Sequence, residues 1–373
     1  MSLVGLQGQG SFLARDAAAS RPEEKGGLLS VLVSTQSRHL TVVAFNSVTG
    51  DFAVSDSHGQ VFYFQMSSNS YQLVRLGGDS KIGSMSFLHS KLNYLALAYD
   101  DGSLVVVDLK KRKAVATMET LGGGVIRMLR CHPKHSLLVG LSVHSTGGRT
   151  LDLYDMKTMS VAGSMPVEED VMDIKFASIK DAQGKHTTYI AVLLEVSGVM
   201  FYNVKDFSLA FSCPFPNSER MPKWTAFSIL DTVDTTEEPD VVEDVAEALQ
   251  EEEPAFRFVT AGANSSMYLW EAPTYDEIAE YAEDKAVGYC SIGAVVEMPV
   301  NVKTATYMQT LGDPSVNNET YRLHVVASSG AGLVIDISGL SQRGFGVKGM
   351  WTVVSDLSDS RAVGSVVERV TTG

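Results

Sequence analysis

The stretch that decides the fold lies in residues 82–118, which read IGSMSFLHSKLNYLALAYDDGSLVVVDLKKRKAVATM. An alternating strand ends at Phe87, an apolar run covers residues 94–99, and an Asp-Asp-Gly turn leads to a third strand. That strand ends at Val107-Asp108, and a basic turn precedes a fourth strand. Alternating apolar and polar residues with glycine turns are typical of antiparallel hairpins. The stretch therefore predicts one four-stranded antiparallel sheet.

The same order of strands and turns recurs along the chain. Its clearest marker is the end of the third strand, where an aromatic or β-branched residue precedes Asp, Glu, Asn or Gln. These pairs are Phe64-Gln65, Val107-Asp108, Tyr154-Asp155, Tyr202-Asn203, Trp270-Glu271 and Ile335-Asp336. The first four follow one another after 43, 47 and 48 residues, and the last two after 68 and 65. We predict six repeats of one four-stranded unit between residue 40 and about residue 340.

Two insertions account for the longer spacings. Residues 231–254 hold eleven acidic residues and no basic one, so this segment carries most of the formal net charge of −14. Residues 274–285, TYDEIAEYAEDK, have the composition of a short helix. We therefore expect an acidic insert in the fifth repeat and a helical insert after its third strand.

Four strands with a period near 40–45 residues are typical of β-propeller blades. Such sheets bury their faces against neighbouring sheets, and a closed ring keeps their edges short. We predict an all-β propeller over residues 26–358 with six recognisable blades, and a seventh that pairs strands at 26–35 and 349–357. Residues 1–25 are expected to be an N-terminal tail, and 359–373 a C-terminal tail or the start of a missing segment.

The pattern resembles the WD40-repeat family in a degenerate form. The closing pairs stand where that family has its Trp-Asp dipeptide, and among them only Trp270-Glu271 keeps the tryptophan. The Gly-His dipeptide that is usual at blade starts is absent from the sequence. The prediction of WD40-like blades therefore depends on the period more than on individual residues.

Residues 26–160 more specifically resemble the propeller of the WD40- and TBC-domain protein family of centriolar satellites and cilia. The matching positions are Gly50-Asp51, Asp56, Gly59, Val61, Phe62, Phe64 and Leu73-Val74-Arg75. The resemblance implies a cytoplasmic protein of the cilium, axoneme or centriole. The helical TBC domain, which in other proteins accelerates GTP hydrolysis by Rab GTPases, has no counterpart in this sequence, and its activity is not carried over.

Composition and charge exclude several classes of protein. Hydrophobic residues make up 45% and charged residues 20%, which is a globular composition. No run of 18 apolar residues occurs, so we expect no membrane span. The negative charge argues against nucleic acid as a partner. Cys131, Cys213 and Cys290 lie far apart, which favours a reducing compartment and argues against a disulfide scaffold or a cysteine zinc site.

The motifs that carry chemistry in other proteins are weak here. His132 and His135 are the one close histidine pair, but Pro133 between them breaks a helix, so we predict a turn and no metal. Residues 122–124 are three glycines without the lysine and helix of a phosphate loop. No Gly-x-Ser-x-Gly elbow occurs. We expect no catalysis, no cofactor and no small-molecule substrate.

Two segments are candidates for partner binding. The first is the acidic insert, for which a solvated loop is the favoured interpretation. The alternative is a short helix on which Val241, Val242, Val245 and Leu249 form an apolar stripe that binds a partner. The second is the basic turn, with the candidate residues Lys111, Arg112 and Lys113 beside Lys110. It is either a solvated hairpin tip or a contact for an acidic partner.

These observations favour a non-enzymatic protein–protein interaction scaffold, a propeller subunit of a multi-subunit assembly. One alternative is the regulatory N-terminal propeller of a longer TBC-type GTPase-activating protein. Another is a WD40 protein that associates with RNA or the ribosome, for which Arg127 would extend the basic turn into a patch. The overall negative charge argues against this last alternative.

Overall fold

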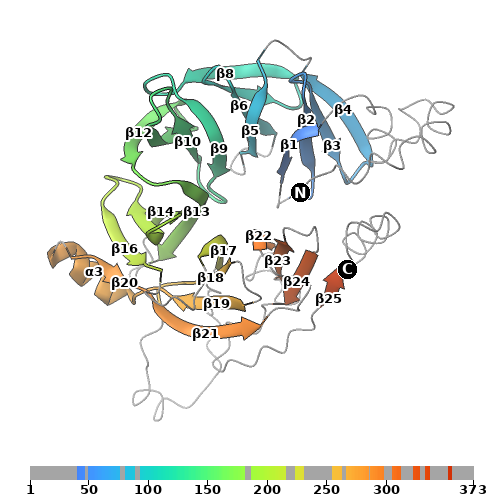
Figure 1. Cartoon of the computed structure of the whole chain (residues 1–373). Coiled ribbons are helices and arrows are strands. Elements are labelled where there is room, and N and C mark those ends of the chain that lie inside the picture. Colours follow the sequence, from blue (N-terminus) through green and yellow to red (C-terminus); the bar gives the residue numbers. More distant parts are fainter. Residues whose placement is uncertain are drawn as a thin grey trace, which may run out of the picture. The chain divides into compact units, whose positions relative to one another are not determined.

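The computed structural model describes residues 40–46, 49–75, 80–88, 93–180, 186–215, 223–230, 254–262, 266–284, 286–297, 305–311, 322–327, 332–336 and 352–354. The chain divides into two compact units, the first ending at Glu168 and the second beginning at Glu169. Both units consist mainly of antiparallel sheets whose strands follow one another along the chain (Figure 1).

The first unit contains three four-stranded sheets among its described residues. Sheet one consists of β1 (Leu40–Phe45), β2 (Phe52–Asp56), β3 (Val61–Gln65) and β4 (Ser70–Arg75). Sheet two consists of β5 (Ile82–Phe87), β6 (Tyr94–Tyr99), β7 (Ser103–Asp108) and β8 (Lys113–Glu119). Sheet three consists of β9 (Val125–Cys131), β10 (Leu137–Val143), β11 (Arg149–Asp155) and β12 (Ser160–Val167).

Sheet two shows why the alternating pattern gives packed blades. Side chains of β7 point to opposite faces in turn, so that Val105 and Val107 join the core shared with sheet one, whereas Leu104 and Val106 join the core shared with sheet three. The turn before β7 needs a left-handed residue, which Gly102 supplies with a φ of 87°. Both faces of sheet two are therefore buried within the first unit.

The second unit contains three further sheets among its described residues. Sheet four consists of β13 (Val171–Lys180), β14 (His186–Leu194), β15 (Gly198–Asn203), β16 (Leu209–Cys213) and β20 (Gly288–Tyr289). Sheet five consists of β17 (Trp224–Leu230), β18 (Arg257–Gly262), β19 (Ser266–Glu271) and β21 (Ser291–Glu297). Sheet six consists of β22 (Ala305–Leu311), β23 (Arg322–Ala327), β24 (Gly332–Asp336) and β25 (Thr352–Val354).

The six predicted closing pairs each end the third strand of a sheet. The strands concerned are β3, β7, β11, β15, β19 and β24. The helical insert is also confirmed, because α3 (Tyr275–Asp284) lies between β19 and β20. Among the described residues, no helix is long and apolar enough to cross a membrane.

The C-terminal strand differs from its prediction. Instead of joining a seventh blade, β25 pairs antiparallel with β24 and supplies the outer strand of sheet six. The physical reason is that β24 would otherwise present an unpaired edge, and β25 satisfies its backbone groups. The seventh blade is therefore not formed as predicted from residues 349–357. The strand predicted at residues 26–35 lies outside the described residues, as do both predicted tails.

Candidate functional site

The insert after β19 begins with a well-capped helix. The Thr274 Oγ1 accepts a hydrogen bond from the Glu277 backbone N–H at 3.3 Å, and the Thr274 N–H donates to Glu277 Oε2 at 2.8 Å. This reciprocal arrangement is a capping box, which satisfies backbone donors that a helix start leaves unpaired. The sequence Thr-x-x-Glu therefore explains why α3 begins where it does.

One side of α3 is anchored to sheets four and five. Tyr275 and Ile278 pack against the hydrophobic core that these two sheets share. Tyr281, two turns from the start of the helix, lies over Gly288, where an added Cβ would come within 2.6 Å of the tyrosine ring. Gly288 thus lets the helix lie close to β20.

The opposite side of α3 is acidic and exposed. Its exposed carboxylates are Asp276, Glu277, Glu280, Glu283 and Asp284. The last turn has no basic residue, although the C-terminal end of a helix carries partial negative charge. Glu283 and Asp284 therefore repel that end, and a cation supplied from outside would relieve the repulsion.

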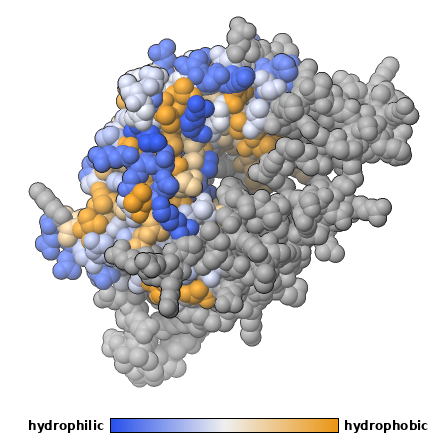
Figure 2. All heavy atoms as spheres, in the orientation of Figure 1, coloured by the Kyte–Doolittle hydropathy of each residue, from blue (hydrophilic) through white to orange (hydrophobic). Residues whose placement is uncertain are grey.

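Two short strands continue from the helix. β20 pairs in parallel with β16 and becomes the fifth strand of sheet four, whereas β21 pairs with β19 and forms the outer strand of sheet five. Tyr289, Ile292 and Val295 on this segment are 67%, 46% and 53% exposed. Figure 2 shows orange hydrophobic spheres beside blue hydrophilic ones at the end of the molecule that carries α3 in Figure 1.

We name the acidic side of α3 together with Tyr289, Ile292 and Val295 the α3–β20–β21 surface. It comprises a negatively charged helix that contacts β20, exposed apolar side chains on β20 and β21, and an outer strand whose far edge pairs with no other described strand. Sequence reasoning found the helix but missed this surface, because it treated residues 274–285 only as an insert. The available signal was the alternation of acidic and apolar residues in YDEIAEYAED.

The basic turn lies where it was predicted, between β7 and β8. Lys110, Lys111, Arg112 and Lys113 are all exposed. Asp108 organises the turn, since its Oδ1 accepts the Lys111 N–H at 2.9 Å, while Lys111 Nζ lies 3.8 Å from Asp108 Oδ2.

Arg112 is held in this turn. Its φ is 55°, and its Nε donates to Gln72 Oε1 at 3.2 Å. Arg127 lies on β9, which packs on β5 and β6. The geometry is that of a hairpin tip whose basic side chains are exposed.

Other sequence candidates have structural roles or lie outside the described residues. His132 is buried in the turn between β9 and β10, where its Nδ1 accepts the N–H groups of Lys134 and His135 at 3.0 and 2.8 Å. Among the described residues, no group of three or more His, Cys, Asp or Glu side chains is placed to hold a metal ion. The apolar stripe of Val241, Val242, Val245 and Leu249 lies outside the described residues.

The three glycines 122–124 join β8 to β9 and make room for a histidine. An added Cβ on Gly124 would come within 3.0 Å of the His144 ring, and one on Gly122 within 3.2 Å. The His144 Nε2 lies 3.1 Å from Thr150 Oγ1, which holds the ring in place. The glycines therefore serve packing in this loop.

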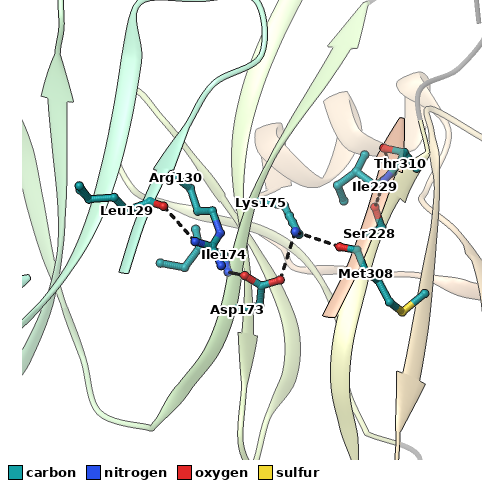
Figure 3. Close-up of polar contacts among 9 residues, drawn as sticks. All are labelled: Leu129, Arg130, Asp173, Ile174, Lys175, Ser228, Ile229, Met308 and Thr310. Carbon is teal, nitrogen blue, oxygen red and sulfur yellow. Dashed lines mark hydrogen bonds and ion pairs between the residues drawn. The ribbon is translucent and has the colours of Figure 1, made fainter. Parts of the chain in front are cut away.

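Polar contacts join the first strands of the second unit's sheets. The Lys175 ammonium on β13 lies 3.3 Å from the Asp173 carboxylate and donates to the Met308 carbonyl oxygen on β22 at 3.2 Å (Figure 3). The Thr310 N–H donates to Ser228 Oγ at 3.2 Å and so links β22 to β17. Each buried charge here has a partner, which is what a stable interior requires.

The architecture is that of an all-β, WD40-like β-propeller. Many solved chains match it, and one of them belongs to the structure titled "Crystal Structure of Mitotic Checkpoint Complex". That match has a TM-score of 0.52 and 10% sequence identity, and covers 85% of this chain and 78% of that chain. No protein-family model and no curated protein matches the sequence. An identity this low shows the fold alone.

Proposed function

We propose that this chain is a non-enzymatic scaffold that binds a partner protein through the α3–β20–β21 surface. The observation that carries the proposal is the combination of three exposed apolar residues on β20 and β21, Tyr289, Ile292 and Val295, with an acidic helix that contacts β20. Exposed apolar groups that cluster next to charge are typical of interaction sites.

The charge and the strand geometry indicate the kind of partner. Five carboxylates on α3, with no basic residue in its last turn, favour a segment rich in lysine or arginine. An outer strand such as β21 presents backbone N–H and C=O groups that an extended peptide can pair with. The partner we propose therefore offers an extended segment in which apolar residues alternate with basic ones.

The assembly we favour is a ciliary or centriolar one, supported by the resemblance in residues 26–160. The apolar stripe of Val241, Val242, Val245 and Leu249 in the acidic insert is a second proposed contact. Lys111, Arg112 and Lys113 are a third, for an acidic partner. Each of these two sets is tested by the same capture assay, with the set replaced by serine.

The test begins with affinity capture of the tagged full chain from its native cells, followed by mass spectrometry. The variant carries Ile292→Lys and Val295→Lys, which places charge on the exposed strand. The matched control is Val115→Lys, since Val115 on β8 is similarly exposed, at 44%. The captured partner is then purified and its affinity measured directly for all three proteins.

We expect the double variant to weaken binding by roughly tenfold or more, as for loss of an interface hot spot, and the control to bind normally. Glu283→Lys with Asp284→Lys should weaken binding of a basic partner in the same assay. A partner that binds every variant equally would exclude the α3–β20–β21 surface as the binding site, but the proposed scaffold function would stand. Recovery of the chain with ribosomal proteins and nucleic acid alone would overturn the scaffold function itself.

A further inference from the structure

Two cysteines that lie far apart in the sequence come together in the second unit. Cys213 ends β16, and Cys290 directly follows β20. These strands pair in parallel with Phe211 opposite Gly288 and Ser212 opposite Tyr289. The Cys290 N–H donates to the Ser212 carbonyl oxygen at 3.0 Å, so the ladder continues to the next position. The register therefore sets Cys213 opposite Cys290.

The side chains of the two cysteines lie on the same face of the sheet. Side-chain direction repeats every second residue along a strand, so Cys213 and Cys290 share the face of Phe211 and Gly288. At that earlier pair, a Cβ built on Gly288 would lie 3.3 Å from Phe211 Cβ. Cβ atoms in disulfides are about 3.5–4.5 Å apart, so strands this close suit a cross-link.

Packing supports the same arrangement. Cys213 is fully buried in the core shared by sheets four and five, and Cys290 packs against that core from a half-buried position. The two thiols are close enough to influence each other. Burial raises the pKa of the Cys213 thiol well above its usual range, and the neighbouring Cys290 sulfur raises this pKa further. Both cysteines are reduced in this structure.

We propose that Cys213 and Cys290 form a reversible, peroxide-sensitive dithiol site that closes to a disulfide between β16 and β20. Cys290 reacts first, because it is the more accessible of the two. Its sulfur attacks one peroxide oxygen, the O–O bond breaks, and a sulfenic acid and water form. The Cys213 sulfur then attacks the Cys290 sulfur, an S–S bond forms, and the hydroxyl leaves with the Cys213 proton as a second water. The two thiols lose two electrons, and the peroxide gains them.

The test uses the reduced full chain treated with hydrogen peroxide, blocked with N-ethylmaleimide and digested without reductant. We expect a cross-linked peptide pair that contains Cys213 and Cys290. The intact mass measured before alkylation should be lower by about 2 Da, because two thiol hydrogens leave. Dithiothreitol should restore both thiols. Cys131→Ser is the matched control, because Cys131 belongs to the first unit. This variant should still form the Cys213–Cys290 disulfide.

Cys290→Ser should abolish the cross-link, and its half-buried position makes it the safer of the two substitutions for folding. The wild-type peptide map decides the question whatever that variant does. Three results of this map overturn the proposal: Cys213 and Cys290 are both alkylated after peroxide, both carry separate oxygen additions, or are bonded to Cys131. In urea the specific pair should be lost, since the strand register that creates it is gone.

Discussion

At the scale of single residues, Trp270 is a large side chain in the core that sheets four and five share. Its Nε1 donates to Thr260 Oγ1 at 2.8 Å, and its ring meets Trp224 edge-on with centroids 5.2 Å apart. We expect Trp270→Ala to lower the free energy of unfolding by about 3–5 kcal/mol, because it leaves a large cavity. Urea denaturation followed by circular dichroism measures this loss.

The comparison variant for this prediction is Trp270→Phe, which keeps one aromatic ring and removes the indole N–H together with part of the ring volume. Thr260 is fully buried, so its hydroxyl loses a partner, at a cost of about 1–3 kcal/mol. A near-neutral Trp270→Ala would show that the ring does not pack as described.

Glu169 makes a pH-dependent contribution to stability. Its carboxylate accepts the N–H groups of Val196 and Ser197 at 3.0 and 2.9 Å and also binds the Ser197 hydroxyl. Burial alone would raise its pKa, but the hydrogen bonds from Ser197 and Val196 outweigh burial and hold the pKa below its ordinary value. A lowered folded-state pKa stabilises the fold above the unfolded-state pKa, and the benefit is lost as the pH falls through the folded-state value.

We therefore expect Glu169→Gln to be less stable than the wild type at pH 7, with a difference that shrinks as the pH falls below the ordinary range of a glutamate. Thermal unfolding at a series of pH values measures the difference. Glu168→Gln is the control, because Glu168 is exposed. A constant difference across the pH series would show that the Glu169 charge is not responsible.

At the scale of elements, the acidic insert belongs to the connection between β17 and β18 of sheet five. β17 and β18 pair from Trp224–Gly262 to Leu230–Arg257, so the ends of the two strands already lie side by side. Deletion of residues 234–253 leaves six residues between Leu230 and Arg257, which is enough for a hairpin connection. We expect the deletion variant to keep the wild-type circular dichroism spectrum and a cooperative thermal transition. Loss of that transition would show that the insert belongs to the fold.

Most strands and the helix could be predicted from the sequence, because the signals that define them lie close together along the chain. The closing pairs, the glycine turns and α3 follow from residue types within a few positions of one another. The pairing of β20 with β16 could not be predicted, because a two-residue strand has no periodicity and its partner lies 77 positions earlier in the register. The α3–β20–β21 surface and the Cys213–Cys290 pair both depend on that pairing.

At the scale of the whole molecule, β20 ties two sheets together. The chain leaves sheet five at β19, adds a strand to sheet four, and returns to sheet five as β21. An opening event that frees β21 therefore also strips sheet four of its fifth strand. We therefore expect sheets four and five to open together as one cooperative unit. The backbone amides of β20 and β21 should then exchange with solvent at rates set by the stability of both sheets, although the surface that they form is exposed.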